Sequence, residues 1–135
     1  MDGVKTVSLV KFKNDSGSLV TADSEVNFNF LSKRIFVVTA NAGAVRGQHA
    51  HKELSQFMMC VQGSCIMKFD NGKDVESILL NENDKGIEVQ PGIWGEQTYL
   101  EDRSTLVVLS DYLYDEDDYI RDYDEFKRYI LGKKI

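Results

Sequence analysis

Apolar and polar residues alternate with a period of two along most of the chain. Val7 and Leu9 have polar neighbours, and the run 34–38 is rich in β-branched and aromatic residues. Further short segments of this kind lie at 57–61, 65–69, 75–80, 87–89, 96–100 and 106–109. Turn-forming residues such as those at 14–17 and 70–73 separate the segments. Many short strands at regular spacing predict an all-β sandwich or barrel.

Two of the expected strands, 57–61 and 65–69, are joined by a short stretch with Gln-Gly at 62–63, which predicts a hairpin. In that hairpin Cys60 and Cys65, the only cysteines, would lie opposite each other across the two strands. Reduced, buried thiols are favoured over a disulfide in a cytosolic protein. The cysteine spacing matches no zinc pattern.

The C-terminal segment changes to the apolar spacing of a helix. Asp122 or Asp124 can cap a helix that runs through Leu131, with Gly132 as its stop. The residues expected to dock this helix on the barrel are Tyr123, Phe126, Tyr129 and Ile130. The pattern therefore predicts a short C-terminal helix on an otherwise all-β chain.

Negative charge is concentrated in this same part of the chain. Lys and Arg number 16 against 22 Asp and Glu, for a formal charge of −6. Residues 111–125 hold eight carboxylates and one arginine, so they carry −7 and the rest carries +1. We interpret this acidic segment as a solvated face with some helix capping. A net acidic chain is a poor ligand for nucleic acid or an anionic membrane, but a small anionic ligand remains admissible.

The length of 135 residues suits one domain spanning 1–135. No apolar run approaches the roughly 18 residues of a membrane-spanning helix. Residues 1–5 are followed by alternation rather than by an apolar core, which predicts no signal peptide. The expected location is therefore the cytoplasm.

Both histidines of the chain lie in the motif 46–52, with sequence RGQHAHK. On a strand, His49 and His51 project from the same face. This His-x-His motif resembles the first motif of the cupins, which are small jelly-roll β-barrels. The Glu of that motif falls on Gln56, and the third His of the second motif falls near Gly95. Because two of the four usual ligands are missing, we expect a cupin barrel with no catalytic metal and no cofactor.

Two histidines without a metal suit acid–base chemistry. Imidazole can take and return a proton near neutral pH, and a second imidazole or Arg46 can stabilise charge that develops on an oxygen. The pair therefore fits proton abstraction next to a carbonyl through an enediol. No G-x-G-x-x-G unit supports hydride transfer, and no G-x-S-x-G motif or activated Cys–His arrangement supports nucleophilic hydrolysis.

Together these motifs resemble the TDP-4-keto-6-deoxyglucose 3,4-ketoisomerases, metal-free cupins of nucleotide-sugar biosynthesis. The segments that carry the resemblance over nearly the whole chain are 46–52, 63–65, 70–72, 91–94 and 114–126. The resemblance implies that the C3 proton of a TDP-linked 4-keto-6-deoxyhexose is removed, an enediol forms, and C4 is protonated to leave a C3 ketone. Such products supply 3-amino-3,6-dideoxy sugars for surface polysaccharides such as lipopolysaccharide O-antigen, for S-layer glycans or for antibiotics.

The resemblance also implies roles for single residues. His49 and His51 match the catalytic histidines, and we assign His51 as the base and His49 as its partner, although the order could be reversed. The residues that match substrate-binding positions are Arg46, Gly47, Lys52, Trp94, Arg34 and Arg121. Arg46 would orient the sugar or bind phosphate, and Arg34 and Arg121 are weaker phosphate candidates. Trp94 would line the pocket or serve packing alone.

A homodimer with exchanged strands is the expected assembly, again from the resemblance. The chain departs from the family pattern at Ser16, at Gly95 and at Phe36-Val37, positions that would surround the sugar. Both C4 configurations of the product, galacto and gluco, therefore stay open. Two alternatives to the ketoisomerase are a metal-dependent cupin enzyme that uses other carboxylates and a non-catalytic module that binds sugar nucleotides.

Overall fold

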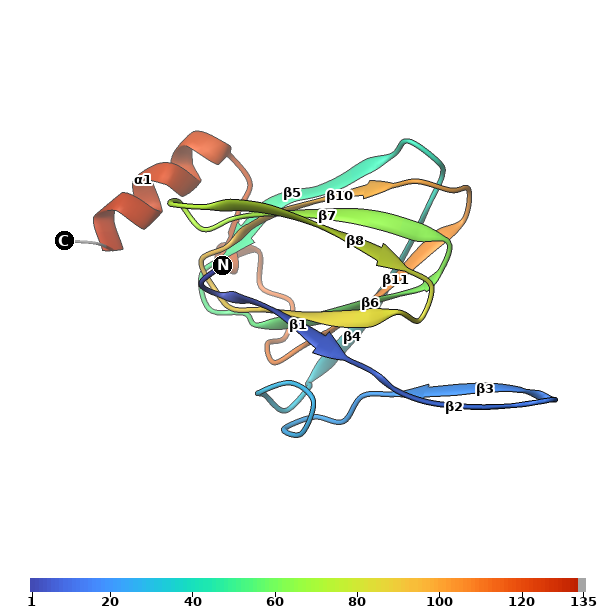
Figure 1. Ribbon diagram of the computed structural model, residues 1–135. Coiled ribbons are helices and arrows are strands. Elements are labelled where there is room, and N and C mark those ends of the chain that lie inside the picture. Colours follow the sequence, from blue (N-terminus) through green and yellow to red (C-terminus); the bar gives the residue numbers. More distant parts are fainter. Residues whose placement is uncertain (134–135) are drawn as a thin grey trace.

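The computed structural model describes residues 1–133 and consists of two five-stranded antiparallel sheets packed face to face (Figure 1). The first sheet contains, in spatial order, β1 (Val4–Ser8), β9 (Lys85–Val89), β6 (Gln56–Gln62), β11 (Ser104–Ser110) and β4 (Arg34–Ala40). The second contains β12 (Tyr119–Ile120), β5 (Val45–His51), β10 (Trp94–Tyr99), β7 (Ser64–Asp70) and β8 (Val75–Asn81). This is the jelly-roll barrel of the cupins, as predicted.

The core lies between the two sheets because alternate side chains of each strand point inward. In β11, Leu106 and Val108 are buried while Val107 between them is only partly buried. From the facing sheet, Met67 and Phe69 of β7 enter the same apolar cluster. The apolar positions of the period-two pattern are thus the ones that face the inside of the barrel.

The predicted hairpin between 57–61 and 65–69 is wrong. β6 pairs with β9 and β11, whereas β7 pairs with β10 and β8, so the two strands belong to different sheets. Gly63 adopts a left-handed φ of 74° that redirects the chain from one sheet to the other. Cys60 and Cys65 still meet, because both side chains point into the core, with their Sγ atoms 3.7 Å apart as free thiols.

Two other predicted turns do form hairpins. β7 and β8 are joined at residues 70–73, and β2 (Val10–Asn14) and β3 (Gly17–Thr21) are joined by the turn at 14–17. The Asn14 carboxamide oxygen accepts the Gly17 N–H at 3.1 Å, as turn chemistry favours. The β2–β3 hairpin extends away from the barrel into open space (Figure 1).

The C-terminal helix α1 spans Tyr123–Lys133. Asp122 is the cap, since its carboxylate accepts the Glu125 N–H at 2.9 Å. Gly132 does not end the helix, because the helical backbone continues to Lys133. Phe126 is fully buried and fixes α1 against one end of the barrel. Within residues 1–133, no helix is long and apolar enough to cross a membrane.

Candidate active site

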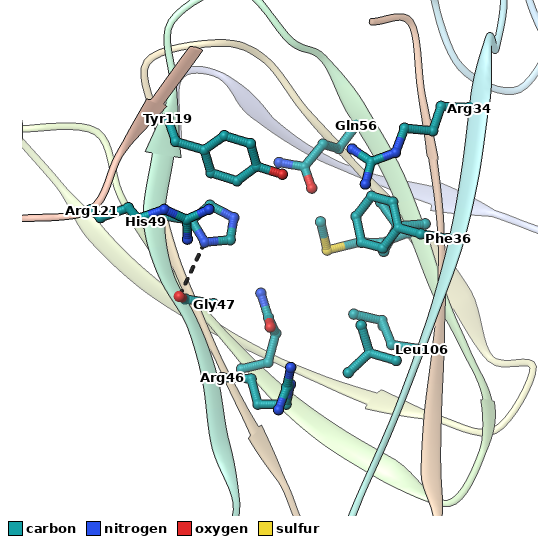
Figure 2. A pocket seen from close by; sticks show the side chains of 13 residues that line it. Arg34, Phe36, Arg46, Gly47, His49, Gln56, Leu106, Tyr119 and Arg121 are labelled. Atoms are coloured by element: carbon teal, nitrogen blue, oxygen red, sulfur yellow. Dashed lines mark hydrogen bonds between the residues drawn. The ribbon is translucent and has the colours of Figure 1, made fainter. Parts of the chain in front are cut away.

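A cavity of about 250 Å³ lies between the two sheets (Figure 2). The first sheet contributes Arg34, Phe36, Val38, Gln56, Met58, Leu106 and Val108. The other wall consists of Arg46, Gly47, His49, Gln97, Tyr119 and Arg121. One wall is thus mainly apolar, and the other carries most of the polar and ionisable side chains.

A β-bulge in β5 shapes the polar wall. Gly47 and Gln48 both have left-handed backbones, with φ of 83° and 58°. Opposite them, Gly95 pairs with His49 and Glu96 with Gly47, so Gln48 is the extra residue. A Cβ on Gly47 would come within 2.7 Å of the Gln97 side chain, which explains the glycine. Bulges of this kind re-aim side chains next to active sites.

The bulge also holds the first histidine. The ring Nδ1 of His49 lies 3.1 Å from the Gly47 carbonyl oxygen. A carbonyl can only accept, so Nδ1 carries the proton and Nε2 is the free, basic nitrogen. Burial, together with the neighbouring His51, lowers the pKa of His49 from 6.5 to about 4. His49 is therefore neutral at physiological pH.

The second histidine is held by a carboxylate that the sequence interpretation missed. His51 donates its Nδ1 proton to Asp118 at 2.9 Å, and both side chains are buried. The other Asp118 oxygen accepts the Glu53 N–H at 2.6 Å, which fixes the carboxylate. Burial lowers the pKa of His51 and outweighs the opposing effect of Asp118. His51 is not among the lining side chains, but its ring lies 5.0 Å from that of His49.

Asp118 comes from the segment that was interpreted as a solvated acidic face. A 3-10 helix, η1 (Glu116–Asp118), turns its last residue inward, and Asp115 caps it by accepting the Asp117 N–H at 3.0 Å. β12 then pairs with the end of β5, which places Asp118 beside His51. The sequence carried no local signal for this contact, because the two residues are 67 positions apart.

Tyr119 of β12 closes the histidine pair from one side. Its ring centroid lies 4.4 Å from that of His51 and 5.0 Å from that of His49. The guanidinium of Arg121 also stacks on Tyr119, 4.2 Å from the ring centre. Both imidazoles are thus packed by an aromatic wall as well as fixed at Nδ1.

The three arginines of the cavity differ in their partners. Arg121 makes two hydrogen bonds to Glu116, at 2.7 and 3.0 Å, and this lowers the pKa of Glu116 to about 2. Within residues 1–133, neither Arg34 nor Arg46 has a carboxylate within 4.0 Å. The charge of Arg121 is therefore already compensated, whereas two uncompensated cations remain for an anionic ligand.

Two predicted substrate-binding residues lie outside this cavity. Trp94 is buried in a cluster with Ile120 and Phe126 beneath α1, and its indole N–H donates to Glu96 at 3.3 Å. Lys52 contributes its backbone N–H to the Asp118 carbonyl at 2.9 Å, and its side chain is not part of the lining. The geometry thus supports packing for Trp94 and gives Lys52 no direct contact with the cavity.

The position where cupins carry a Glu ligand is occupied by Gln56, whose carboxamide faces the cavity (Figure 2). In the described part of the chain, no three His, Cys, Asp or Glu side chains form a group that could hold a metal ion. The side chains that are present provide two imidazoles, each hydrogen-bonded through Nδ1 and with no partner for Nε2 within residues 1–133, beside uncompensated guanidinium groups. This arrangement can move protons and stabilise negative charge on oxygen.

Comparison with known proteins agrees with this chemistry. The chain is 37% identical over 127 residues to the TDP-4-oxo-6-deoxy-alpha-D-glucose-3,4-oxoisomerase of Aneurinibacillus thermoaerophilus, covering 93% of this chain and 91% of the relative. A sugar 3,4-ketoisomerase from Thermoanaerobacterium thermosaccharolyticum, solved in complex with TDP, has a TM-score of 0.93 at 26% identity, over 100% of this chain and 99% of its own.

A 3,4-ketoisomerase from Helicobacter canadensis has a TM-score of 0.91 at 33% identity, over 97% of this chain and 98% of its own. The sequence model of one protein family, described as "FdtA: WxcM-like, C-terminal", matches residues 2–131. The chain belongs to this FdtA (WxcM-like, C-terminal) family, which has the sugar 3,4-ketoisomerases among its relatives.

Proposed function

We propose that this protein is a TDP-4-keto-6-deoxyglucose 3,4-ketoisomerase. The observation that carries the proposal is the imidazole pair: two neutral rings 5.0 Å apart, each with its Nδ1 hydrogen-bonded, of which His49 lines the cavity and His51 adjoins His49. The names of the relatives supply the substrate class, a TDP-linked 4-oxo-6-deoxy sugar.

The proposed reaction moves a proton between adjacent carbons without changing the composition of the sugar. A base takes the proton from C3, the electron pair of that C–H bond forms the C3=C4 double bond, and the π pair of the carbonyl moves to the C4 oxygen, which takes up a proton to give an enediol. A proton is then delivered to C4 as the C3 hydroxyl loses its own, which leaves a ketone at C3. Each step requires only groups that accept or donate protons near neutral pH.

We assign His51 as the base and His49 as its partner. The imidazolium that forms on proton abstraction gains stabilisation from the buried Asp118 carboxylate, which already accepts the Nδ1 proton of His51. His49 has only a neutral carbonyl at the same position, so its charged form is less stabilised. This asymmetry favours His51 for uptake of the proton.

The cavity also fits one part of this substrate better than the whole of it. Its volume of about 250 Å³ is below the roughly 300–1,000 Å³ of pockets for drug-sized ligands. We propose that the hexose occupies the cavity and that the nucleotide lies at its mouth. Exposed, uncompensated Arg46 would then bind the diphosphate, and the apolar side chains of Phe36 and Met58 would accommodate the C6 methyl group.

The test is conversion of TDP-4-keto-6-deoxyglucose by the purified protein, followed by NMR. We expect a 3-keto product whose coupling constants at C4 decide between the galacto and gluco configurations. Binding of TDP without any change in the sugar would instead favour the non-catalytic module. Activity that depends on stoichiometric bound iron, manganese or zinc would favour the metal-dependent cupin.

We also propose a homodimer with exchanged strands, acting in the cytoplasm on a soluble sugar nucleotide. The β2–β3 hairpin supports the assembly, because it projects from the barrel with Phe12 61% and Leu19 58% exposed. The outer edge strand β4 exposes Ile35 and Val37 in the same way, and such edges invite pairing with another chain. Light scattering should give twice the chain mass, and Phe12→Asp with Leu19→Asp should reduce it to the monomer mass.

A further inference from the structure

Arg34 stands out as a cation on the mainly apolar wall of the cavity. It begins β4, and its guanidinium lies 4.8 Å from the ring centre of Phe36 and 5.4 Å from that of Tyr114. Its Nη1 atom is buried and has no hydrogen-bond partner among residues 1–133. A buried donor on a charged group that lacks a partner is costly, which indicates that a ligand completes the site.

The position of Arg34 differs from that of the other two cavity arginines. Arg46 is exposed on β5, on the same strand as His49, and Arg121 is paired with Glu116. Arg34 lies across the cavity from His49, on the side of Phe36 (Figure 2). A hexose between the two sheets would therefore have the imidazoles on one side and the Arg34 guanidinium on the other.

We propose that Arg34 is a catalytic residue that stabilises the enediolate oxygen of the sugar, rather than a ligand of the diphosphate. The inference rests on the proposed ketoisomerase function. As the C3–H bond breaks, its electron pair becomes negative charge on the C4 oxygen, and the free Nη1 donates to that oxygen. The same guanidinium serves the C3 oxygen once the proton has been delivered to C4.

The electrostatics of the cavity agree with this role. Aromatic rings hold the guanidinium without neutralising it, so its full charge is available in a partly desolvated space. The positive charge of Arg34 also lowers the pKa of His51, which keeps that imidazole in its basic form. A phosphate ligand would be expected at the mouth with Arg46, whereas Arg34 has a buried donor and no solvent on that atom.

The experiment compares Arg34→Gln with Arg46→Gln, and uses Arg128→Gln on the exposed face of α1 as the control for loss of one positive charge. We expect Arg34→Gln to lower kcat about 10²- to 10³-fold, the usual loss of one oxyanion donor, with the Kd for TDP within about threefold of wild type. Arg46→Gln should instead weaken the Kd for TDP, because it removes the proposed contact with the diphosphate.

Two further readouts keep the test decisive. Loss of the Arg34 charge should move the acidic limb of the kcat–pH profile to higher pH, a shift that a merely structural residue would not cause. If Arg34→Gln does not fold, Arg34→Lys is the second variant, since it retains the positive charge but not the planar guanidinium with its several N–H donors. It should lower kcat about tenfold and leave the Kd for TDP unchanged. If Arg34→Gln or Arg34→Lys weakens the Kd for TDP tenfold and leaves kcat intact, the proposal is overturned. Wild-type protein without isomerase activity would overturn the proposed function itself.

Discussion

The two walls of the cavity are built from the same kind of strand but carry opposite chemistry. On the wall formed by β5, β10 and β12, ionisable side chains such as His49 are fixed by hydrogen bonds to the backbone or to buried carboxylates. On the wall formed by β4, β6 and β11, the side chains are mainly aliphatic or aromatic, as at Met58 and Val108. In the proposed reaction, proton transfer would therefore take place on one side of the sugar, with the mainly apolar wall on the other side.

The polar wall contains buried imidazoles, which need hydrogen-bond acceptors to be stable inside a barrel. A buried imidazole is stable when it is neutral and its N–H has an acceptor. Gly47 and Asp118 provide these acceptors, and each depends on a local irregularity, a bulge for the first and a 3-10 turn for the second. The apolar wall needs no such device and is regular throughout β11 except for one register shift at its start.

The largest effect is expected from the histidine that Asp118 supports. His51→Asn should lower kcat about 10³-fold, in the upper part of the range for loss of a general base. Binding of TDP, measured by titration calorimetry, should stay within about threefold of wild type because no nucleotide contact is removed. Turnover equal to that of wild type would refute the assignment of His51 as the base.

Asp118→Asn should have the next largest effect, because the carboxamide cannot stabilise the imidazolium and can hold the wrong tautomer. We expect kcat to fall about 10²-fold, with the acidic limb of its pH profile moved to lower pH as the pKa of His51 falls further. Asp117→Asn, one residue earlier in η1 and exposed, is the matched control and should behave as wild type. Equal losses in both variants would argue against a specific role for Asp118.

On the apolar wall, Val108→Thr replaces a buried methyl group by a hydroxyl of the same shape. Val108 is 2% exposed, so the free energy of unfolding should fall by about 1–3 kcal/mol, while kcat stays within about threefold. Val107→Thr, on the outer face of the same strand, should cost less than about 0.5 kcal/mol. Urea denaturation measures both, and a tenfold loss of kcat in Val108→Thr would show that this wall takes part in proton transfer.

The smallest effect concerns stability in acid. Unfolded His49 binds a proton with a pKa near 6.5 and the folded residue with a pKa of about 4, so the unfolded chain takes up more protons in this window. The contribution of His49 to the free energy of unfolding is therefore complete above pH 7, and it is lost as the pH drops from 6.5 towards 4. Between pH 7 and pH 5, His49 should contribute a loss of about 1 kcal/mol, allowing for its partial exposure. The non-titrating variant His49→Gln should show a smaller loss over the same range.

The sequence predicts those parts of the fold that depend on neighbours along the chain. Alternation identified most of the strands, though not β12, and the i, i+2 spacing placed His49 and His51 on one strand with ring centroids 5.0 Å apart. The same local reasoning failed at Gly63, because a left-handed glycine can close a hairpin or carry the chain to another sheet. Only the pairing of β6 and β7 with other strands distinguishes the two outcomes.

The site was predictable to a similar degree. Arg46 and His49 lie where the motif suggested, because one strand carries both. Asp118 was missed since its partner is distant in sequence and its charged neighbours look like a solvated surface. The uncompensated state of Arg34 and the compensated state of Arg121 are also tertiary properties, set by whether a carboxylate such as Glu116 happens to fold nearby.

The most direct test of the central claim is position-resolved deuterium incorporation. Wild-type protein and His51→Asn are incubated with TDP-4-keto-6-deoxyglucose in deuterated water, and the sugar is analysed by NMR. If one cavity wall performs the proton transfer, wild type places deuterium at C4 of the 3-keto product and exchanges C3 of the recovered substrate, whereas His51→Asn does neither above background. Conversion of the substrate by His51→Asn at the rate of the wild type, or equal exchange by the two proteins, would contradict the account.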